Sequence, residues 1–352
     1  MFHFSPRNAL LPSTALAILL GLTACGGGGG SDDTTASASA SAAAAGAAAA
    51  AGAAAGTASG AAAGAAAGTI TTTTTPPPAL PTKALGLTDQ RASPVATPNV
   101  VRLVGFDIAT PNTLTSDVAI TASTGGAFAA NEWIFGMDYR PVDGLLWGLT
   151  NRGRLYTIDP GTGVATFKIA LVADPAAPGF TGLDASTSVS VDFNPQADRM
   201  RVVTFVGQNL RINVATGATI EDTPVPPVAA TGFSFVAGAA YTNSFAGATA
   251  TTLFTINNSR DDLATQTPPN SGTQVTVGAL RVAISEVQGI DIAGSTNQLA
   301  LGALSLDGAV GPHSLYNINL TTGAAVLRPT TTGTAAIGGP TGLPLVDIAI
   351  RP

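Results

Sequence analysis

The stretch VSVDFNPQADRMRVVTFVGQNLRINVATG, residues 189–217, contains the pattern on which the rest of the chain is built. A Val-rich strand ends in Asp192 and an Asn-Pro turn, and two further strands over 200–205 and 209–214 close at a Thr-Gly turn. Short β-branched runs bounded by such turns are typical of meandering antiparallel sheets. This stretch therefore predicts one small sheet.

The same order of strands and turns recurs on both sides of this stretch. It appears over residues 136–163 and again over 289–323, each time ending in a Thr-Gly turn. The first strand of each unit carries a marker residue, and the markers are Asp138, Asp192, Tyr241, Asp291 and Asp347. Their spacing is about fifty residues, and a repeat of that length with several short strands indicates a β-propeller.

The fourth unit is looser than the others. Its strands are predicted over 239–243, 252–257 and 276–280, and a long loop is predicted over 266–272.

The two ends of the repeat region complete each other. Residues 345–350 have the pattern of a first strand with no partners after it, whereas 102–108 and 116–122 have the pattern of third and fourth strands with none before them. Pairing these segments gives one composite blade, and closure into a ring protects the strand edges. The sequence thus favours an all-β, five-bladed propeller, with an open repeat or a different blade count as the alternative.

Residues 1–24 have the parts of a bacterial lipoprotein signal peptide. A weakly positive start with Arg7 precedes an apolar run over 15–22, and Leu-Thr-Ala-Cys ends at Cys25. This motif resembles the lipobox, which implies lipidation of Cys25 and cleavage before it. A plain secretory signal is one alternative; a transmembrane helix is the other, although the run is far shorter than the ~20 residues needed to span a bilayer. Gly26 resembles the outer-membrane pattern, so we expect a lipid-anchored protein of the bacterial cell envelope, at the outer membrane.

Residues 25–97 consist mainly of Ala, Gly, Ser, Thr and Pro. Such a composition cannot bury enough apolar surface to offset the entropy of ordering, so we predict a disordered tether. The propeller domain is predicted over 98–352. Cys25 is the only cysteine, which excludes disulfides within the chain.

Several separated motifs in the repeat region together resemble an uncharacterised bacterial family, domain of unknown function 4394. They are DFNP (192–195), DRMRV (198–202), QNLRIN (208–213), AYTN (240–243) and PPNSG (268–272). The resemblance covers residues 99–350. It implies an exported, propeller-like domain and brings no catalytic residues to transfer.

Four of the marker residues are aspartates at equivalent places on first strands. In a closed propeller Asp138, Asp192, Asp291 and Asp347 would form an incomplete ring near the central channel. Carboxylate rings can bind Ca²⁺ or Mg²⁺. Aspartates at recurring turns also accept backbone hydrogen bonds, here from their own turn or the next blade. We favour the second interpretation and predict no cofactor, with Ca²⁺ as the alternative.

The blade over 189–217 also carries a charged face. Strand alternation puts Arg199 and Arg201 on one face, where stacked blades should be apolar. They belong either to a paired polar layer, with Asp192 and Asp198 as local partners, or to the wall of a pocket suited to a carboxylate or a sugar. We expect the paired layer at Arg201 and the pocket at Arg211. The candidate ligand site is Asp192, Arg199, Arg201, Asn209 and Arg211.

Few residues are suited to catalysis. His313 is the only histidine after the predicted signal, and the chain has no His-Glu-x-x-His zinc motif, no Gly-x-Ser-x-Gly elbow and no Walker loop. A net charge of −6, with only Lys83 and Lys168 as lysines, argues against nucleic acid as a partner.

Two function classes remain. The first is a non-enzymatic, membrane-tethered binding module, expected to be a monomer, for a protein, glycan or envelope component. The second is a hydrolase or lyase that uses Asp and Arg residues at the propeller channel, which rests on analogy between folds.

Overall fold

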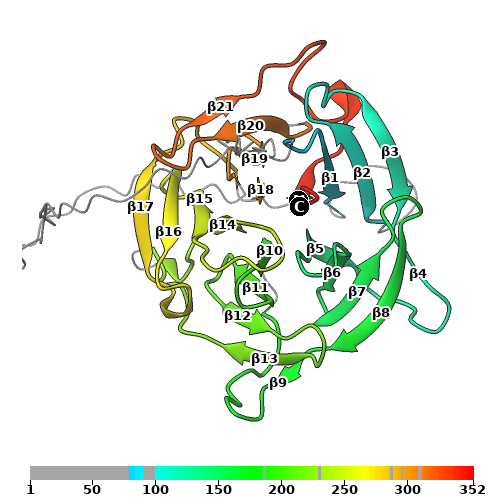
Figure 1. The fold of residues 1–352 in the computed structure, drawn as a ribbon, viewed down its shortest axis with the longest axis vertical. Coiled ribbons are helices and arrows are strands. Elements are labelled where there is room, and N and C mark those ends of the chain that lie inside the picture. The colour runs from blue at the N-terminus through cyan, green and yellow to red at the C-terminus, as the bar shows by residue number, and fades with distance from the viewer. Residues whose placement is uncertain are drawn as a thin grey trace, which may run out of the picture. The chain divides into compact units, whose positions relative to one another are not determined.

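The computed structural model describes residues 79–89, 100–184, 188–228, 231–285, 288–294, 296–307 and 311–352. These residues belong to one unit, residues 74–352, and form five small sheets of four or five strands. The sheets are arranged radially as the blades of a β-propeller (Figure 1). The predicted all-β class and five blades are therefore confirmed. The predicted signal peptide, Cys25 and the tether up to residue 78 lie outside the described residues.

Each blade is a short meander that runs from an innermost strand to the rim. From the centre outward, blade 1 consists of β22 (Leu345–Ala349), β1 (Lys83–Thr88), β2 (Arg102–Asp107) and β3 (Leu114–Ala119), and blade 2 consists of β5 (Ile134–Tyr139), β6 (Leu146–Thr150), β7 (Arg154–Ile158) and β8 (Val164–Ala170). In the same order, blade 3 consists of β10 (Val189–Asn194), β11 (Arg199–Thr204), β12 (Asn209–Ile212) and β13 (Ala218–Glu221), and blade 4 of β14 (Val236–Tyr241), β15 (Leu253–Asn257), β16 (Asp262–Gln266) and β17 (Gln274–Ala279). Blade 5 consists of β18 (Gly289–Ala293), β19 (Leu299–Leu304), β20 (Ser314–Ile318) and β21 (Ala325–Leu327).

Two additional short strands link neighbouring blades at the rim. β4 (Thr121–Ala122) pairs in parallel with β8, and β9 (Val172–Ala173) pairs in parallel with β13. Helical structure in the described ranges is limited to short 3₁₀ turns such as η3 (Pro269–Ser271) and η4 (Gly339–Thr341). None of these helices is long and apolar enough to cross a bilayer.

The hydrophobic core lies between the blades, because the inner strands are covered on both faces. Every residue of β14 and of β19 is buried, for example. Apolar clusters fill the interfaces between neighbouring blades. Among the described residues, the smallest of these clusters lies between blades 3 and 4 and includes Val203 and Val236. A polar network takes up part of that interface.

Blade 1 combines strands from the two ends of the domain. β22 is its innermost strand, and β2 and β3 are its third and fourth strands, as predicted. The second strand, β1, pairs with both β22 and β2. It lies inside the segment predicted as tether, so the predicted domain boundary at residue 98 is wrong for this strand. The sequence KALGLT stands between low-complexity segments, and its partner β22 is far away in the chain, so no local pattern reveals it.

The recurring Thr-Gly turns allow neighbouring blades to approach closely at the rim. Gly163 and Gly217 both have φ of 73°, in the left-handed region that favours glycine. A Cβ atom at Gly217 would lie 2.2 Å from the carbonyl oxygen of Ala170, and one at Gly163 would lie 2.3 Å from that of Ala119. Both carbonyl groups belong to the preceding blade. Glycine is therefore needed for the turn and for the contact between blades.

Blade 4 contains a strand that the sequence pattern does not predict. β16, with the sequence DLATQ, occupies the third position, and the strand predicted over 276–280 corresponds to the fourth strand, β17. The β16 sequence contains a single β-branched residue, so it lacks the composition used to recognise the other strands.

Candidate functional site

Four aspartates on the innermost strands join neighbouring blades. Each buried carboxylate accepts a hydrogen bond from a backbone N–H of the next blade. The pairs are Phe193 to Asp138 (2.8 Å), Tyr241 to Asp192 (3.2 Å), Ile350 to Asp291 (2.5 Å) and Met137 to Asp347 (2.9 Å). The predicted role as backbone acceptors is confirmed. Blade 4 differs, because its innermost strand contains no aspartate and supplies the donor Tyr241.

Burial raises the pKa of all four carboxyl groups. It raises the pKa of Asp291 to about 7 and those of Asp138, Asp192 and Asp347 well above the usual range, and repulsion between neighbouring carboxylates adds to the latter three shifts. The charged forms are therefore disfavoured at the centre of the ring.

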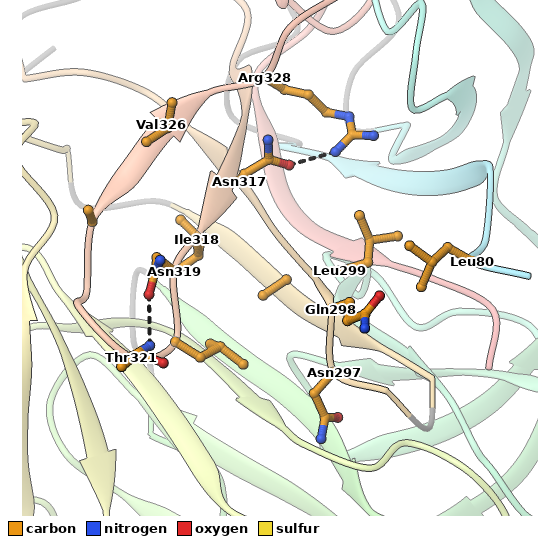
Figure 2. A pocket seen from close by; sticks show the side chains of 13 residues that line it. Leu80, Asn297, Gln298, Leu299, Asn317, Ile318, Asn319, Thr321, Val326 and Arg328 are labelled. Carbon is orange, nitrogen blue, oxygen red and sulfur yellow. Dashed lines mark hydrogen bonds between the residues drawn. The ribbon is translucent and has the colours of Figure 1, made fainter. Parts of the chain in front are cut away.

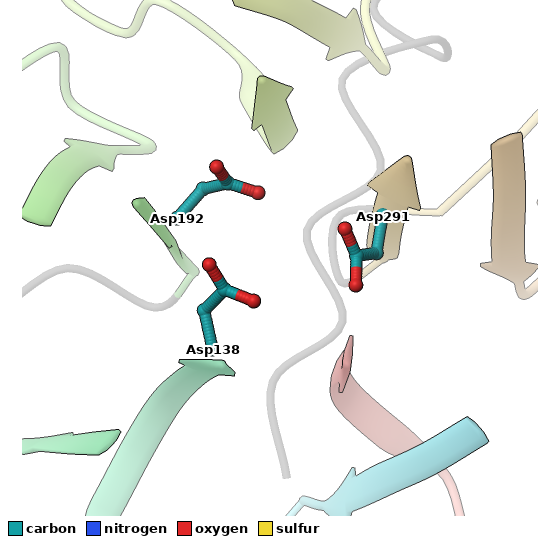
Figure 3. Close-up of side chains that lie close together, drawn as sticks. All are labelled: Asp138, Asp192 and Asp291. Atoms are coloured by element: carbon teal, nitrogen blue, oxygen red, sulfur yellow. The ribbon is translucent and has the colours of Figure 1, made fainter. Parts of the chain in front are cut away.

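The same carboxylates lie close enough together to hold a metal ion. Asp138, Asp192 and Asp291 offer oxygens within 4.8 Å of one another (Figure 3). However, both oxygens of Asp138 and both of Asp291 already accept backbone N–H groups. Ca²⁺ takes six to eight oxygen ligands. The arrangement accordingly fits backbone hydrogen bonding and protonation better than the coordination shell of calcium.

Arg201 lies within a closed polar network between blades 3 and 4. Its side chain is only 2% exposed. Its guanidinium group donates four hydrogen bonds, to Asp222 Oδ2 (2.8 Å), Asn209 Oδ1 (2.8 Å), Asn270 Oδ1 (2.7 Å) and Tyr241 Oη (3.2 Å). A buried guanidinium is stable only with such partners. The expected paired layer at Arg201 is therefore present, and it joins two blades.

The carboxylate of this network is Asp222, which follows β13. Asp192 and Asp198, the partners predicted from the sequence, are not the ones that Arg201 contacts. Arg211 contacts the same carboxylate through Nε (2.6 Å) and Nη2 (2.8 Å), and its side chain is 33% exposed. Two of its N–H groups bind Asp222, so Arg211 also belongs to the network, and the pocket predicted at its exposed side stays a prediction.

The other members of the predicted ligand site do not gather around this network. Asp192 contacts blade 4 at the centre of the ring. Arg199 donates to the backbone oxygens of Ala197 and Asp198, and the Asp198 carboxylate pairs with Arg140 at 2.5 Å. The predicted residues are thus divided among three places.

His313 is also used to hold strands together. Its side chain is buried, and its Nδ1 accepts the backbone N–H of Leu345 at 3.1 Å. Leu345 is the first residue of β22, so the imidazole positions the innermost strand of blade 1. A general base must reach the proton that it removes, and His313 lacks that access.

An open pocket of about 620 Å³ lies on the face of blade 5 that is directed toward blade 1 (Figure 2). Asn317 from β20 and Asn319 just after it line the pocket, together with Val326 from β21 and Arg328 just after that strand. These side chains share one face, because Asn317 pairs with Val326 and residues two apart in a strand point to the same side. Arg328 Nε donates to the backbone oxygen of Ile108 in blade 1 at 3.0 Å.

This pocket was not predicted from the sequence. Its polar residues are mainly amides, which resemble ordinary turn residues, and Leu80 on its border lies in the segment predicted as tether. The available signal is weak. Arg328 is a lone arginine in a Thr-rich and Gly-rich segment.

Solved structures with weak similarity to this chain include designed and natural proteins. The computationally designed Ika8 protein has a TM-score of 0.32 and 11% identity, over 70% of this chain and 68% of that one. A structural genomics protein of unknown function from Bacteroides thetaiotaomicron has a TM-score of 0.34 and 10% identity, over 77% of this chain and 88% of that one. BamB from Moraxella catarrhalis has a TM-score of 0.26 and 15% identity, over 68% and 73%.

No curated protein matches the chain. A protein-family model does. The model described as "Domain of unknown function (DUF4394)" matches residues 102–341, which is more than half of the chain, and the protein therefore belongs to this family.

Proposed function

We propose that the protein is a lipid-anchored lipoprotein of the bacterial envelope whose propeller is a non-enzymatic binding module for a protein, glycan or other envelope component. The lipobox-like sequence ending at Cys25 and the tether-like composition after it support anchorage. Gly26 supports the outer membrane as its location.

One observation carries the binding role. The four central aspartates, Arg201 and His313 bridge blades in buried positions, whereas the pocket on blade 5 is open and lined by amide, apolar and guanidinium groups. Concave sites with an apolar lining and a few oriented polar groups are the usual form of a ligand-binding site.

The hydrolase or lyase alternative requires an Asp or Arg side chain that reaches a substrate. Asp138, Asp192, Asp291 and Asp347 are each 3–4% exposed, and Arg201 is 2% exposed. Their hydrogen bonds to neighbouring blades already occupy the groups that would act on a bond. The arrangement supports a structural role for these residues and favours binding over chemistry.

The anchorage is tested with a Cys25→Ala variant of the full chain expressed in a bacterial host. We expect the wild-type protein to incorporate labelled palmitate and to sediment with membranes, and the variant to do neither. A variant that remains lipid-labelled and membrane-bound would exclude the lipoprotein proposal.

The choice between binding and catalysis is tested by incubating the full chain with purified envelope glycans and proteins and following both by mass spectrometry. We expect components to be retained without change in mass. A new product that accumulates with time and requires the protein would support the enzyme alternative instead.

A further inference from the structure

Two amide side chains of the pocket on blade 5, Asn317 and Asn319, have a common property: their oxygen atoms are already used. Asn319 Oδ1 accepts the backbone N–H groups of Thr321 and Thr322, both at 2.9 Å. Asn317 Oδ1 accepts a hydrogen bond from Arg328 Nη1 at 2.6 Å (Figure 2). Since an amide has both an acceptor oxygen and a donor NH₂ group, these two side chains retain their donors for a ligand.

Arg328 adds further donors to the same face. Its hydrogen bonds to Asn317 and to the backbone oxygen of Ile108 use two of the five N–H bonds of a guanidinium. Burial lowers its pKa and a nearby Asp107 opposes that effect, yet a guanidinium remains charged at neutral pH. Among the residues that the structure describes, Arg328 is the only charged one in the lining, and Asp107 is not part of it.

The rest of the lining is mixed: Asn297, Gln298 and Thr321 are polar, whereas Leu80, Leu299 and Val326 are apolar. Leu299 is buried in its floor, and Leu80 and Val326 border it with 41% and 58% of their surfaces exposed. Arg328, Asn317 and Asn319 therefore favour a ligand that presents hydrogen-bond acceptors, preferably with negative charge, and Leu80, Leu299 and Val326 can contact an apolar group of the same ligand.

We infer that this pocket binds the carboxylate group of a small amphipathic ligand, with Arg328, Asn317 and Asn319 as the donors. This inference deepens the proposed binding function and rests on it. Planar bidentate recognition by arginine is the usual means of binding a carboxylate. The cavity volume of about 620 Å³ falls within the range of small-ligand sites.

Asn319→Asp is a direct test, because the chain contains a natural control for its folding. Asp159 occupies the equivalent turn of blade 2 and accepts the N–H groups of Gly161 and Thr162 at 2.9 and 2.8 Å. An aspartate at position 319 can therefore keep the turn while it puts a negative charge into the pocket. The matched control is Asn213→Asp, which makes the same change in the turn of blade 3, where Asn213 caps Ala215.

The experiment uses the full chain and saturation-transfer NMR with phenylacetate and hexanoate as probes, and phenylacetamide and hexanamide as their neutral counterparts. We expect saturable binding of the carboxylates, at least tenfold weaker binding of the amides, and a loss of carboxylate affinity of at least tenfold in Asn319→Asp. Asn213→Asp should bind like the wild type, and thermal melts should show both variants folded.

Three results would overturn the assignment: no saturable binding of either carboxylate, equal binding of carboxylate and amide, or an unchanged affinity in folded Asn319→Asp. If Asn319→Asp does not fold, Arg328→Lys takes its place, because lysine keeps the charge without the planar fork; unchanged affinity would again count against the site. None of these results bears on membrane anchorage or product formation, so failure of the carboxylate site is distinguishable from failure of the proposed function.

Discussion

Replacing Arg201 with alanine should destabilise the propeller strongly, because the guanidinium lies between two blades without access to water. The change removes a charge-assisted hydrogen bond to Asp222, which is worth about 1.5–3 kcal/mol, and leaves Asn270 Oδ1 without this donor, which costs about 1–3 kcal/mol. We therefore expect a loss of about 3–5 kcal/mol in the free energy of unfolding, similar to other broken buried ion pairs.

Arg211→Ala should cost much less, although it removes a bidentate contact to the same carboxylate. The Arg211 side chain is 33% exposed, and Asp222 keeps its contact with Arg201. Exposed and half-exposed pairs contribute under about 1 kcal/mol. In the double variant, however, the Asp222 carboxylate is left buried without either cation. The combined loss should then exceed the sum of the single losses by about 0.5–3 kcal/mol.

Urea unfolding of the full chain, followed by the fluorescence of its two tryptophans, Trp133 and the buried Trp147, measures these differences. Arg102→Ala is the control, because Arg102 pairs with Asp117 at the surface, where their side chains are 33% and 43% exposed. An Arg201→Ala loss as small as that of Arg102→Ala would refute the closed network. Equal losses in Arg201→Ala and Arg211→Ala, with simple additivity, would refute the sharing of Asp222.

Three further predictions concern the centre, the rim and the closure of the ring. The pKa of Asp291 is about 7 in the folded state and 3.8 ordinarily, so the folded state holds the proton more tightly. The free energy of unfolding should therefore fall by up to about 4 kcal/mol as the pH rises from about 4 to about 7. Urea melts at a series of pH values should show a smaller change of the free energy of unfolding with pH in Asp291→Asn than in the wild type. Gly217→Ala should lower stability by at least about 1–2 kcal/mol in thermal melts, because φ is 73° at this position and the new Cβ would collide with the carbonyl oxygen of Ala170. Gly179→Ala is the control and should be neutral, because a Cβ at Gly179 would lie in open space. Equal effects of the two substitutions would contradict the rim contact. Deletion of residues 345–352 removes β22 and should abolish the cooperative unfolding transition, and a truncated chain that melts like the full one would contradict ring closure.

The fold was largely predictable because the repeat is local. First strands, Thr-Gly turns and the pairing of the two ends follow from patterns of fewer than about ten residues, for which turn chemistry and β-branched composition are informative. β1 was missed because its stability comes from β22 and β2, which are distant in sequence, and not from its own composition.

The site was less predictable because it depends on contacts between blades. The sequence indicated that Arg201 is buried and needs a carboxylate, and the nearest acids in the chain were Asp192 and Asp198. The actual partner, Asp222, lies beyond the fourth strand of the same blade, and Asn270 comes from blade 4. The backbone-acceptor role of the central aspartates was predictable, since it repeats with the blades.

The composite blade also determines when the ring can form during biosynthesis. β22 is synthesised after every other strand of the ring, and its Asp347 bonds to Met137, 210 residues earlier in the chain. Contacts of such long range slow folding. Until β22 is available, the inner edge of β1 lacks its partner, and unpaired edges are the places where chains mispair. The ring can therefore close only after the whole domain, up to and including β22, has been synthesised.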